Sequence, residues 1–255
     1  MAWIAALLDS RTALSIWRRS LPRSQVRLHP CRSARELEHA LQTRLIETIV
    51  LGPRAAGQVE IGGLRARYPV IPILIFGRLR PEDAEALLQW DRAEVGPVLV
   101  EGVDDAVASE ILLRHSASSR RLAARAEFPR MLRLTERLQL RAWDRLAGSA
   151  GRPPRIAPLA RSLGVSREHL SRQFGAGGAP NLKRVSDLLS VQAALELLTN
   201  PGYPVATVAR LLEFASPSHL RTVVKRVTGA RLEQARQLGH RELLRRFLRL
   251  SGGPD

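Results

Sequence analysis

Residues 156–174 read IAPLARSLGVSREHLSRQF, and residues 204–227 read PVATVARLLEFASPSHLRTVVKRV. The two stretches share one pattern, in which a short apolar helix is followed by a turn, a serine and a second helix with basic outward positions. Two helices joined by such a short turn are typical of a helix-turn-helix. The repeated pattern therefore predicts two helix-turn-helix units, and the rest of the chain is interpreted around them.

The first unit has a residue suited to each part of the motif. Gly164 can adopt the left-handed conformation that the turn requires, and Ser166 is a good N-cap for the second helix. Leu170 and Phe174 point inward at i, i+4. The outward residues at the N-terminal end, where a recognition helix presents its base-reading side chains, are Arg167, Glu168, Ser171 and Arg172. An arginine can donate to both guanine O6 and N7, and a glutamate can accept from cytosine N4.

The second unit follows the same order. Ser216 is the predicted N-cap, Pro217 occupies the first helical position, and Leu220 points inward. The outward residues of its second helix are Ser218, Arg221, Thr222 and Lys225. Between the units, residues 182–199 predict one helix of roughly 27 Å at ~1.5 Å per residue. Such a helix could hold two recognition helices about 34 Å apart, which is one turn of B-DNA.

Positive charge is concentrated in the C-terminal half. The chain has 40 Lys and Arg and 24 Asp and Glu, of which residues 1–118 contain 15 and 14. Residues 119–255 therefore contain 25 Lys and Arg against only 10 Asp and Glu. A half with this excess is suited to a polyanion, and nucleic acid is the commonest one. High arginine content alone could reflect genome composition, but that would not place the charge in one half.

Cys31 is the only cysteine, so a disulfide within the chain is impossible, and a reducing cytoplasm is the expected location. The first eight residues are apolar but lack a basic start, and we do not interpret them as a signal peptide. No apolar run reaches the roughly 18 to 20 residues of a membrane span, so we expect no membrane partner.

The N-terminal half predicts an α/β domain. Five apolar runs recur along it, at Trp3–Leu8, Gln25–His29, Ile46–Leu51, Val70–Phe76 and Pro97–Glu101. Consecutive apolar positions indicate strands that are buried on both faces of a parallel sheet. Helical patterns lie between them, at Ala34–Leu41, Pro81–Trp90 and Val103–His115. The alternation predicts a doubly wound, five-stranded parallel sheet.

In length and element order this half resembles the receiver domains of two-component response regulators. The site residues of that family are missing here. Asp9 is followed by Ser10 instead of a second acid, the phosphoacceptor position reads Leu51-Gly52-Pro53, the Ser/Thr position is Gly77, and the lysine position falls near Val100-Glu101. Phosphoryl transfer needs carboxylates to hold magnesium and one to attack. We therefore expect a receiver-like domain that is not phosphorylated and serves dimerisation or protein contact, with a small ligand at the strand ends as an alternative.

The C-terminal half resembles the DNA-binding domain of the AraC/XylS family of transcription regulators. The matching residues are LARSLGVSREHLSRQF, AALELL, VARLLEFASPSHLRTVVKRVTG and Arg236. By that resemblance the base-reading positions are Glu168, Ser171, Arg172, Ser218, Arg221 and Thr222. Four further cations are predicted to contact DNA phosphates, namely Arg167, Lys225, Arg226 and Arg236. The chain departs from the family at Glu213, where a glycine is usual in the second turn, and at Ser190, Val224 and Arg231-Leu232.

The predicted layout has four parts. Residues 1–118 form the receiver-like domain, 119–129 a linker, 130–237 the DNA-binding domain, and 238–255 a basic C-terminal tail. Within this layout, residues 130–147 predict the first helix of the DNA-binding domain, and residues 241–250 predict a basic amphipathic helix.

The sequence thus predicts a cytoplasmic regulator of transcription that binds double-stranded DNA and is not an enzyme. We expect no cofactor and no metal, because the six histidines show no ligand spacing. A homodimer through the N-terminal domain and a contact with RNA polymerase are open expectations. Two alternatives stay open at this point: a signalling or scaffold protein whose DNA-binding domain has decayed, and a catalytic N-terminal domain attached to a DNA-binding one.

Overall fold

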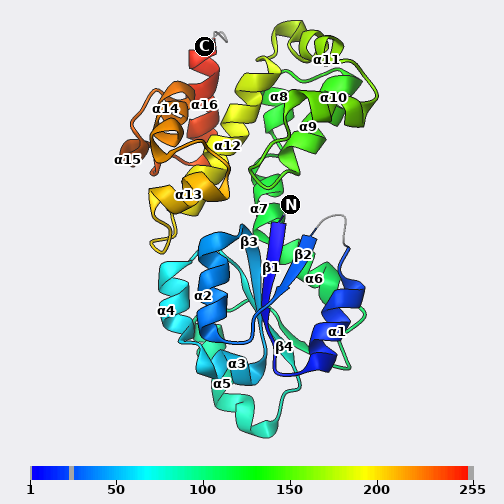
Figure 1. Cartoon of the computed structure of the whole chain (residues 1–255), viewed down its shortest axis with the longest axis vertical. Helices are drawn as coiled ribbons and strands as arrows, with labels where there is room; N and C mark the ends of the chain where they lie inside the picture. Colours follow the sequence, from blue (N-terminus) through cyan, green and yellow to red (C-terminus); the bar gives the residue numbers. More distant parts are fainter. Residues whose placement is uncertain (1, 23–25, 252–255) are drawn as a thin grey trace. The chain divides into compact units, whose positions relative to one another are not determined.

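The computed structural model describes residues 2–22 and 26–251, and these divide into two compact units (Figure 1). The α/β unit comprises the residues up to 120 together with 200–203, and the helical unit comprises 121–199 and the residues from 204 onward. Each unit is described below by itself.

The α/β unit is built on a five-stranded sheet in the order β2-β1-β3-β4-β5, and all of its strand pairs are parallel. This confirms the predicted fold class. The strands are β1 (Ala2–Leu7), β2 (Val26–Pro30), β3 (Ile46–Leu51), β4 (Ile73–Gly77) and β5 (Val98–Val100). Each strand falls within or beside a predicted apolar run. Gln25, which was predicted to begin the second strand, lies outside the described residues.

Helices cover both faces of this sheet (Figure 1). They are α1 (Arg11–Ser20), α2 (Ala34–Thr43), α3 (Pro53–Gln58), α4 (Ile61–Arg67), η1 (Pro81–Asp83), α5 (Ala84–Arg92) and α6 (Ala108–His115). β3 and β4 are buried along their whole length, which is why their sequences are largely apolar, although β3 also buries Glu47 and Thr48. On one face Trp17 packs edge-on against Phe76, with 5.1 Å between ring centroids, and residues of α6 complete that core.

Two of the predicted helices differ in their extent. The segment predicted from Pro81 begins with the 3-10 turn η1, and the segment predicted from Val103 becomes helical only at Ala108. Residues between β5 and α6 form turns instead, because the Asp104 and Asp105 carboxylates accept hydrogen bonds from the backbone N–H groups of Val100 and Gly102. Such local bonds compete with a helix.

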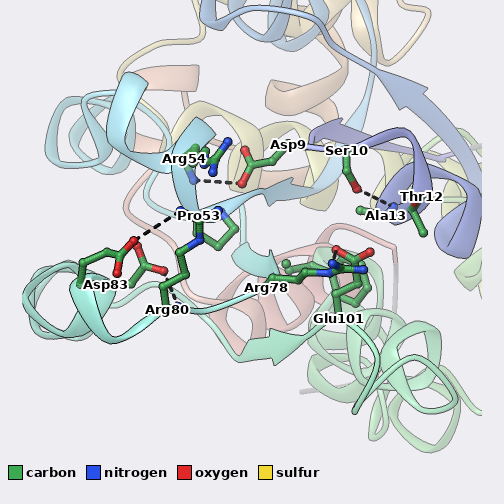
Figure 2. A pocket seen from close by; sticks show the side chains of 13 residues that line it. Asp9, Ser10, Thr12, Ala13, Pro53, Arg54, Arg78, Arg80, Asp83 and Glu101 are labelled. Carbon is green, nitrogen blue, oxygen red and sulfur yellow. Dashed lines mark hydrogen bonds and ion pairs between the residues drawn. The ribbon is translucent and has the colours of Figure 1, made fainter.

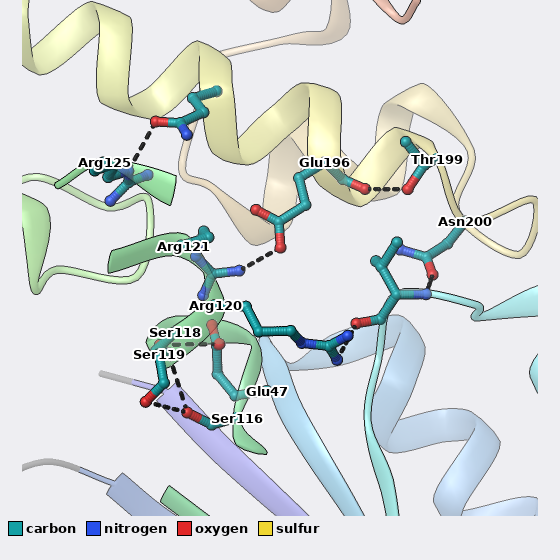
Figure 3. A network of polar contacts seen from close by, with 12 residues as sticks. Glu47, Ser116, Ser118, Ser119, Arg120, Arg121, Arg125, Glu196, Thr199 and Asn200 are labelled. Atoms are coloured by element: carbon teal, nitrogen blue, oxygen red, sulfur yellow. Dashed lines mark hydrogen bonds and ion pairs between the residues drawn. The ribbon is translucent and has the colours of Figure 1, made fainter. Parts of the chain in front are cut away.

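Residues 200–203 belong to the α/β unit through several contacts. The Gly202 N–H donates to the Arg67 carbonyl at 2.9 Å, and Gln42 Nε2 donates to the Gly202 carbonyl at 2.9 Å. The rings of Tyr68 and Tyr203 meet edge-on, 5.1 Å apart. Figure 3 shows the neighbouring bond from the Val70 N–H to the Asn200 side chain, at 3.2 Å. The segment is therefore ordered by α/β contacts that its sequence did not indicate.

The segment predicted as a linker, 119–129, is largely helical. It contains the second half of α7 (Ala117–Ala124), and α8 (Phe128–Met131) begins inside it. Ser116, just before this segment, caps α7 by accepting from the Ser119 N–H at 3.2 Å. The division between the two units falls within α7, at residues 120 and 121.

The helical unit continues with nine helical segments, whose bounds follow. They are α9 (Arg137–Ala147), α10 (Ile156–Leu163), α11 (Arg167–Phe174), η2 (Ala176–Gly178), α12 (Leu182–Leu198), α13 (Val205–Leu211), α14 (Pro217–Thr228), α15 (Leu232–Ala235) and α16 (His240–Leu250). The helix predicted over 130–147 is divided, because Arg133 takes a left-handed conformation (φ 57°) between α8 and α9. The predicted tail contains α16, which buries Leu243, Leu244 and Phe247.

α12 is the central helix of this unit, and most of its side chains are buried. Two arginines bond to α12, namely Arg121 of α7 and Arg125, which directly follows α7 (Figure 3). Arg121 pairs with Glu196 at 3.2 Å, and Arg125, which is 1% exposed, donates through Nε to Gln192 at 2.7 Å. A buried guanidinium needs such acceptors, so these bonds explain why basic residues occur in a packed segment.

Candidate nucleic-acid interface

The first helix-turn-helix consists of α10, the turn and α11. α10 ends at Gly164, which has φ 72° and ψ 30°, the left-handed conformation predicted for it. Ser166 Oγ accepts from the His169 N–H at 3.1 Å and so caps α11, as predicted. Leu170 and Phe174 are fully buried, which fixes the face of α11 that points outward.

A buried glutamine holds the C-terminal end of α11 in place. Gln139 of α9 is 1% exposed, and its Nε2 donates to the carbonyls of Gln173, Phe174 and Ala176 at 3.0–3.3 Å. Its Oε1 accepts from the backbone N–H groups of residues 135 and 136 at 2.9 Å. One side chain thus satisfies the last carbonyls of α11 and the start of α9.

The second helix-turn-helix consists of α13, the turn and α14, and its turn contains the predicted non-glycine residue. Glu213 has φ 62°, a conformation that side chains other than glycine rarely adopt. Ser216 Oγ accepts from the His219 N–H at 3.0 Å, and the His219 ring packs edge-on against Phe214 at 5.8 Å. The substitution of glycine by Glu213 therefore leaves the second motif intact.

All six predicted base-reading residues are solvent-exposed on α11 and α14. Glu168 lies in the first turn of α11 and Arg172 in its last turn, with Ser171 between them, whereas Ser218, Arg221 and Thr222 lie in the N-terminal half of α14. Thr222 Oγ1 donates to the Ser218 carbonyl at 3.0 Å, so its hydroxyl is engaged within α14. The arrangement presents two short polar surfaces of the size that a major groove admits.

The predicted DNA-binding cations fall into two groups. Arg167, Arg172, Arg221 and Lys225 are exposed, and their side chains make no hydrogen bond or ion pair with any residue that the structure describes. By contrast, Arg226 Nη2 donates to Asp187 at 2.7 Å, and Arg236 donates to the Leu198 carbonyl at the end of α12. Arg226 and Arg236 therefore already have a structural role in the unbound protein.

The α/β unit has a cavity of about 480 Å³ at the carboxyl ends of its strands (Figure 2). Asp9 borders it, but its carboxylate accepts from the backbone N–H groups of Arg54 and Ala55 at 2.9–3.0 Å and thereby caps α3. A Cβ atom added to Gly52 would lie 2.5 Å from the Asp9 carboxylate. A side chain at the position of the phosphoacceptor in receivers would therefore displace the Asp9 carboxylate from its bonds to α3.

The other positions around this cavity also differ from those of a phosphorylated receiver. A side chain at Gly77 would collide with Pro53. Where a receiver carries a lysine, Glu101 pairs with Arg78 at 3.8 Å, and its side chain is only 8% exposed. Within residues 2–22 and 26–251, no group of three His, Cys, Asp or Glu side chains could hold a metal ion.

Sequence reasoning missed Gln139 and Asp187, which hold the two recognition helices. The residues that they contact on α11 and α14 are 34 or more residues away in sequence. The i, i+4 spacing of Lys183 and Asp187 indicates only the bond between those two residues. Among the described residues, no helix has both the length and the hydropathy needed to cross a bilayer.

Comparison with known proteins identifies the C-terminal motif. Residues 159–238 match a family model described as a helix-turn-helix domain. No curated protein matches the chain. The solved structures include RcsB from Salmonella enterica serovar Typhimurium, bound to promoter rprA in the presence of phosphomimetic BeF3-. This structure is 15% identical, with a TM-score of 0.38, and the match covers 69% of this chain and 89% of the RcsB chain. Full-length FixJ from B. japonicum is 12% identical, with a TM-score of 0.38. The match covers 84% of this chain and 98% of the FixJ chain.

These two structural likenesses are too weak to bear on function. The match to residues 159–238 spans both turns, both recognition helices and the helix α12 that connects them. We therefore place a DNA-binding helix-turn-helix domain of the AraC type, the kind found in transcription regulators, at residues 159–238.

Proposed function

We propose that this protein is a sequence-specific regulator of transcription that reads two successive major-groove segments of double-stranded DNA with α11 and α14. The observation that carries the proposal is the state of four cations. Arg167 and Arg172 on α11, and Arg221 and Lys225 on α14, are exposed without a partner among the described residues. Because no residue of the described chain occupies these four side chains, they are available to an external polyanion, and arginine and lysine are usual donors to DNA phosphates.

The proposed roles follow from residue chemistry. Arg172 and Arg221 would donate to base edges, with Glu168, Ser171, Ser218 and Thr222 adding further base contacts. Arg167 and Lys225 would contact phosphates. Arg226 and Arg236 would do so only with the N–H groups that Asp187 and Leu198 leave unused. Phosphate contacts would supply affinity, and base contacts would supply sequence preference.

For the α/β unit we propose dimerisation or sensing without phosphorylation. Asp9 is engaged as a helix cap, and the positions of Gly52 and Gly77 have no room for the side chains that phosphorylation requires. The cavity of about 480 Å³ lies in the size range of ligand pockets and at the strand ends where α/β domains bind ligands. Contact with RNA polymerase stays an expectation to which no surface is assigned.

The test is fluorescence anisotropy of the full chain on DNA from upstream of its own gene, with a scrambled duplex as control and several salt concentrations. We expect a preference of at least several hundred-fold for the natural sequence, and an affinity that falls steeply with salt. Salt-dependent binding without preference, also after unbiased site selection, would favour a decayed DNA-binding domain. Absence of binding at low salt would refute the proposal.

A further inference from the structure

The two helix-turn-helix motifs are supported by different helices of the helical unit. α10 and α11 pack against α9, whereas α13 and α14 pack against α12. Between α11 and α12 the chain runs through residues 175–181, which contain three glycines. Because glycine permits many backbone conformations, this loop alone fixes the mutual orientation of the two motifs poorly. Any second contact between the motifs therefore bears on how they are oriented.

The segment between α9 and α10, residues 148–155, supplies such a contact, and we call it the strap. It contains two consecutive residues in the left-handed conformation, Ala150 (φ 53°) and Gly151 (φ 80°). Ala150 is buried, and a Cβ atom added to Gly151 would lie 2.2 Å from the Cβ atom of Ala193 on α12. The backbone of the strap therefore lies directly against the helix that supports the second motif.

Arg152 joins the strap to the turn of the second motif. Its Nε donates to the carbonyl of Leu211, the last residue of α13, and its Nη1 lies 3.2 Å from a carboxylate oxygen of Glu213. The last carbonyls of a helix have no partner within that helix, and the guanidinium supplies one here. Leu211 is 1% exposed and the Glu213 side chain 70%, so the carbonyl bond is the better shielded of the two contacts.

The other end of the strap leads directly into the first motif. Pro153 and Pro154 follow Arg152, and Arg155 is the N-cap of α10. Because each proline ring fixes its backbone φ angle, this stretch is stiff, and the position of Arg152 is transmitted to the start of α10. One short piece of chain thus holds both the turn of the second motif and the first helix of the first motif.

We propose that the strap fixes the mutual orientation of the two motifs, and that Arg152 is the positioning residue that does so through the Leu211 carbonyl. This orientation decides whether α11 and α14 meet successive major-groove segments together, so its consequence for DNA rests on the proposed function. With the strap intact, the motifs lose little freedom on binding. Without it, they are ordered only by the DNA and accept a wider range of distances between the two half-sites.

The first experiment measures this orientation in the full chain without DNA. Spin labels are attached at Gln173→Cys and Lys225→Cys, which are exposed positions on α11 and α14, and their distance distribution is measured by electron double resonance. Cys31 is the only native cysteine, so the background is Cys31→Ser. We expect one narrow distribution with the native strap and a broader one in Arg152→Met, which keeps an apolar stem but removes both contacts. An equally narrow distribution in Arg152→Met would overturn the proposal.

Two further variants separate orientation from folding. Pro153→Gly with Pro154→Gly loosens the strap but leaves the contacts of Arg152 in place, and it should also broaden the distribution. Arg155→Met is the matched control, because the Arg155 side chain is exposed and makes no cap hydrogen bond, and it should leave the distribution narrow. Hydrogen exchange of α11 and α14 should stay slow in all variants. Equal broadening in Arg155→Met, or none in the double proline variant, would contradict the proposal.

The consequence for DNA is measured by anisotropy on the preferred site and on the same site with one base pair inserted between its half-sites. The insertion moves one half-site by ~3.4 Å along the axis. It should weaken binding of the unmodified protein by about tenfold or more, as a mismatched base pair does, and binding of Arg152→Met by only about threefold. Equal weakening in both proteins would mean that Arg152 does not set the spacing. If the distance distributions behave as expected but no DNA is preferred, the proposed function fails while the strap stands.

Discussion

The turn of the second helix-turn-helix should become more stable when Glu213 is replaced by glycine. Glu213 has φ 62°, and the corresponding residue of the first turn, Gly164, has φ 72°. The two units therefore use the same left-handed backbone conformation, one with a glycine and one without. This makes the pair of turns a natural comparison for the energy of that conformation.

The magnitude follows from three terms. The left-handed conformation costs a residue with a side chain about 1–2 kcal/mol, which glycine avoids. A glycine also increases the conformational freedom of the unfolded chain, which offsets about 0.4–1 kcal/mol of that gain. The ion pair between Arg152 and Glu213 spans 3.2 Å, but the Glu213 side chain is 70% exposed, so losing it costs about 0–1 kcal/mol. With each term at the middle of its range, the balance favours Glu213→Gly by about 0.3 kcal/mol.

Two further variants separate these terms. A Cβ atom at Gly164 would meet no atom within 4 Å, so Gly164→Ala introduces the backbone energy without a collision and should destabilise the first turn by about 1 kcal/mol. Glu213→Ala removes the ion pair while keeping the left-handed conformation, and should lower stability by the ion-pair term alone, about 0–1 kcal/mol.

Hydrogen exchange followed by mass spectrometry resolves these effects, because peptides from residues 156–174 and 204–228 report each motif separately. We expect slower exchange in the second peptide for Glu213→Gly and faster exchange in the first for Gly164→Ala. Faster exchange for Glu213→Gly than for Glu213→Ala would refute the reasoning, since both variants lack the ion pair and glycine would then cost more through the freedom of the unfolded chain than it gains in the left-handed turn.

Three other predictions concern single residues. Arg172→Ala should weaken binding to the preferred DNA by about 1–3 kcal/mol and relax its sequence preference in anisotropy measurements, and an equal loss on scrambled DNA would contradict a base contact. Gly202→Ala should lower the free energy of unfolding by about 1–3 kcal/mol in urea titrations, because the new Cβ would lie 2.7 Å from the Tyr68 ring; an unchanged midpoint would mean that the ring moves aside. Burial, together with the nearby Arg125, lowers the pKa of His240 below its ordinary 6.5, so the unfolded chain binds more protons and stability should fall as the pH drops below 6.5. Exchange of the peptide 240–250 measured against pH checks this, and His240→Gln should remove the dependence.

The strands of the α/β unit could be predicted because burial on both faces leaves a direct trace in the sequence. Every residue of β3 and β4 is buried; β4 appears as an uninterrupted apolar run, and β3 as one that is broken only by Glu47 and Thr48. The short helices α3 and α4 left no such trace. α3 contains Gly57 and α4 contains two glycines, which lower the intrinsic helix preference of both segments. Helices this short depend on packing against the rest of the unit more than on that preference.

The domain boundary was predicted at residues 116–121, at the start of the linker 119–129, because those six residues are small, polar and basic. Those properties describe the side chains but not their partners. Arg121 and Arg125 are buried, and they are stabilised there by Glu196 and Gln192, some 70 residues further along the chain. A pattern that is typical of a solvated joint therefore also occurs in a packed helix when distant acceptors are supplied.

The parts of the DNA-binding site that could be predicted are those set by neighbours in sequence. Caps at Ser166 and Ser216 act over three residues, and the turn at Gly164 depends on one backbone angle. What could not be predicted is which cations are already bonded. Arg226 and Lys225 are adjacent in sequence and both exposed, yet only Arg226 is paired, because only Arg226 lies within reach of Asp187.

The two recognition helices are held by polar contacts at different places but with a common consequence. α11 is fixed through the carbonyls of its last turn by Gln139, and α14 is fixed near its C-terminal end by the Arg226 bond to Asp187. Neither contact involves the N-terminal half of its helix, where the side chains of Arg167 and Arg221 stay without a partner among the described residues. Rigid anchoring at one end and unpaired cations at the other is the arrangement that base reading requires, because a recognition helix must be oriented by its own protein before its exposed end meets the groove.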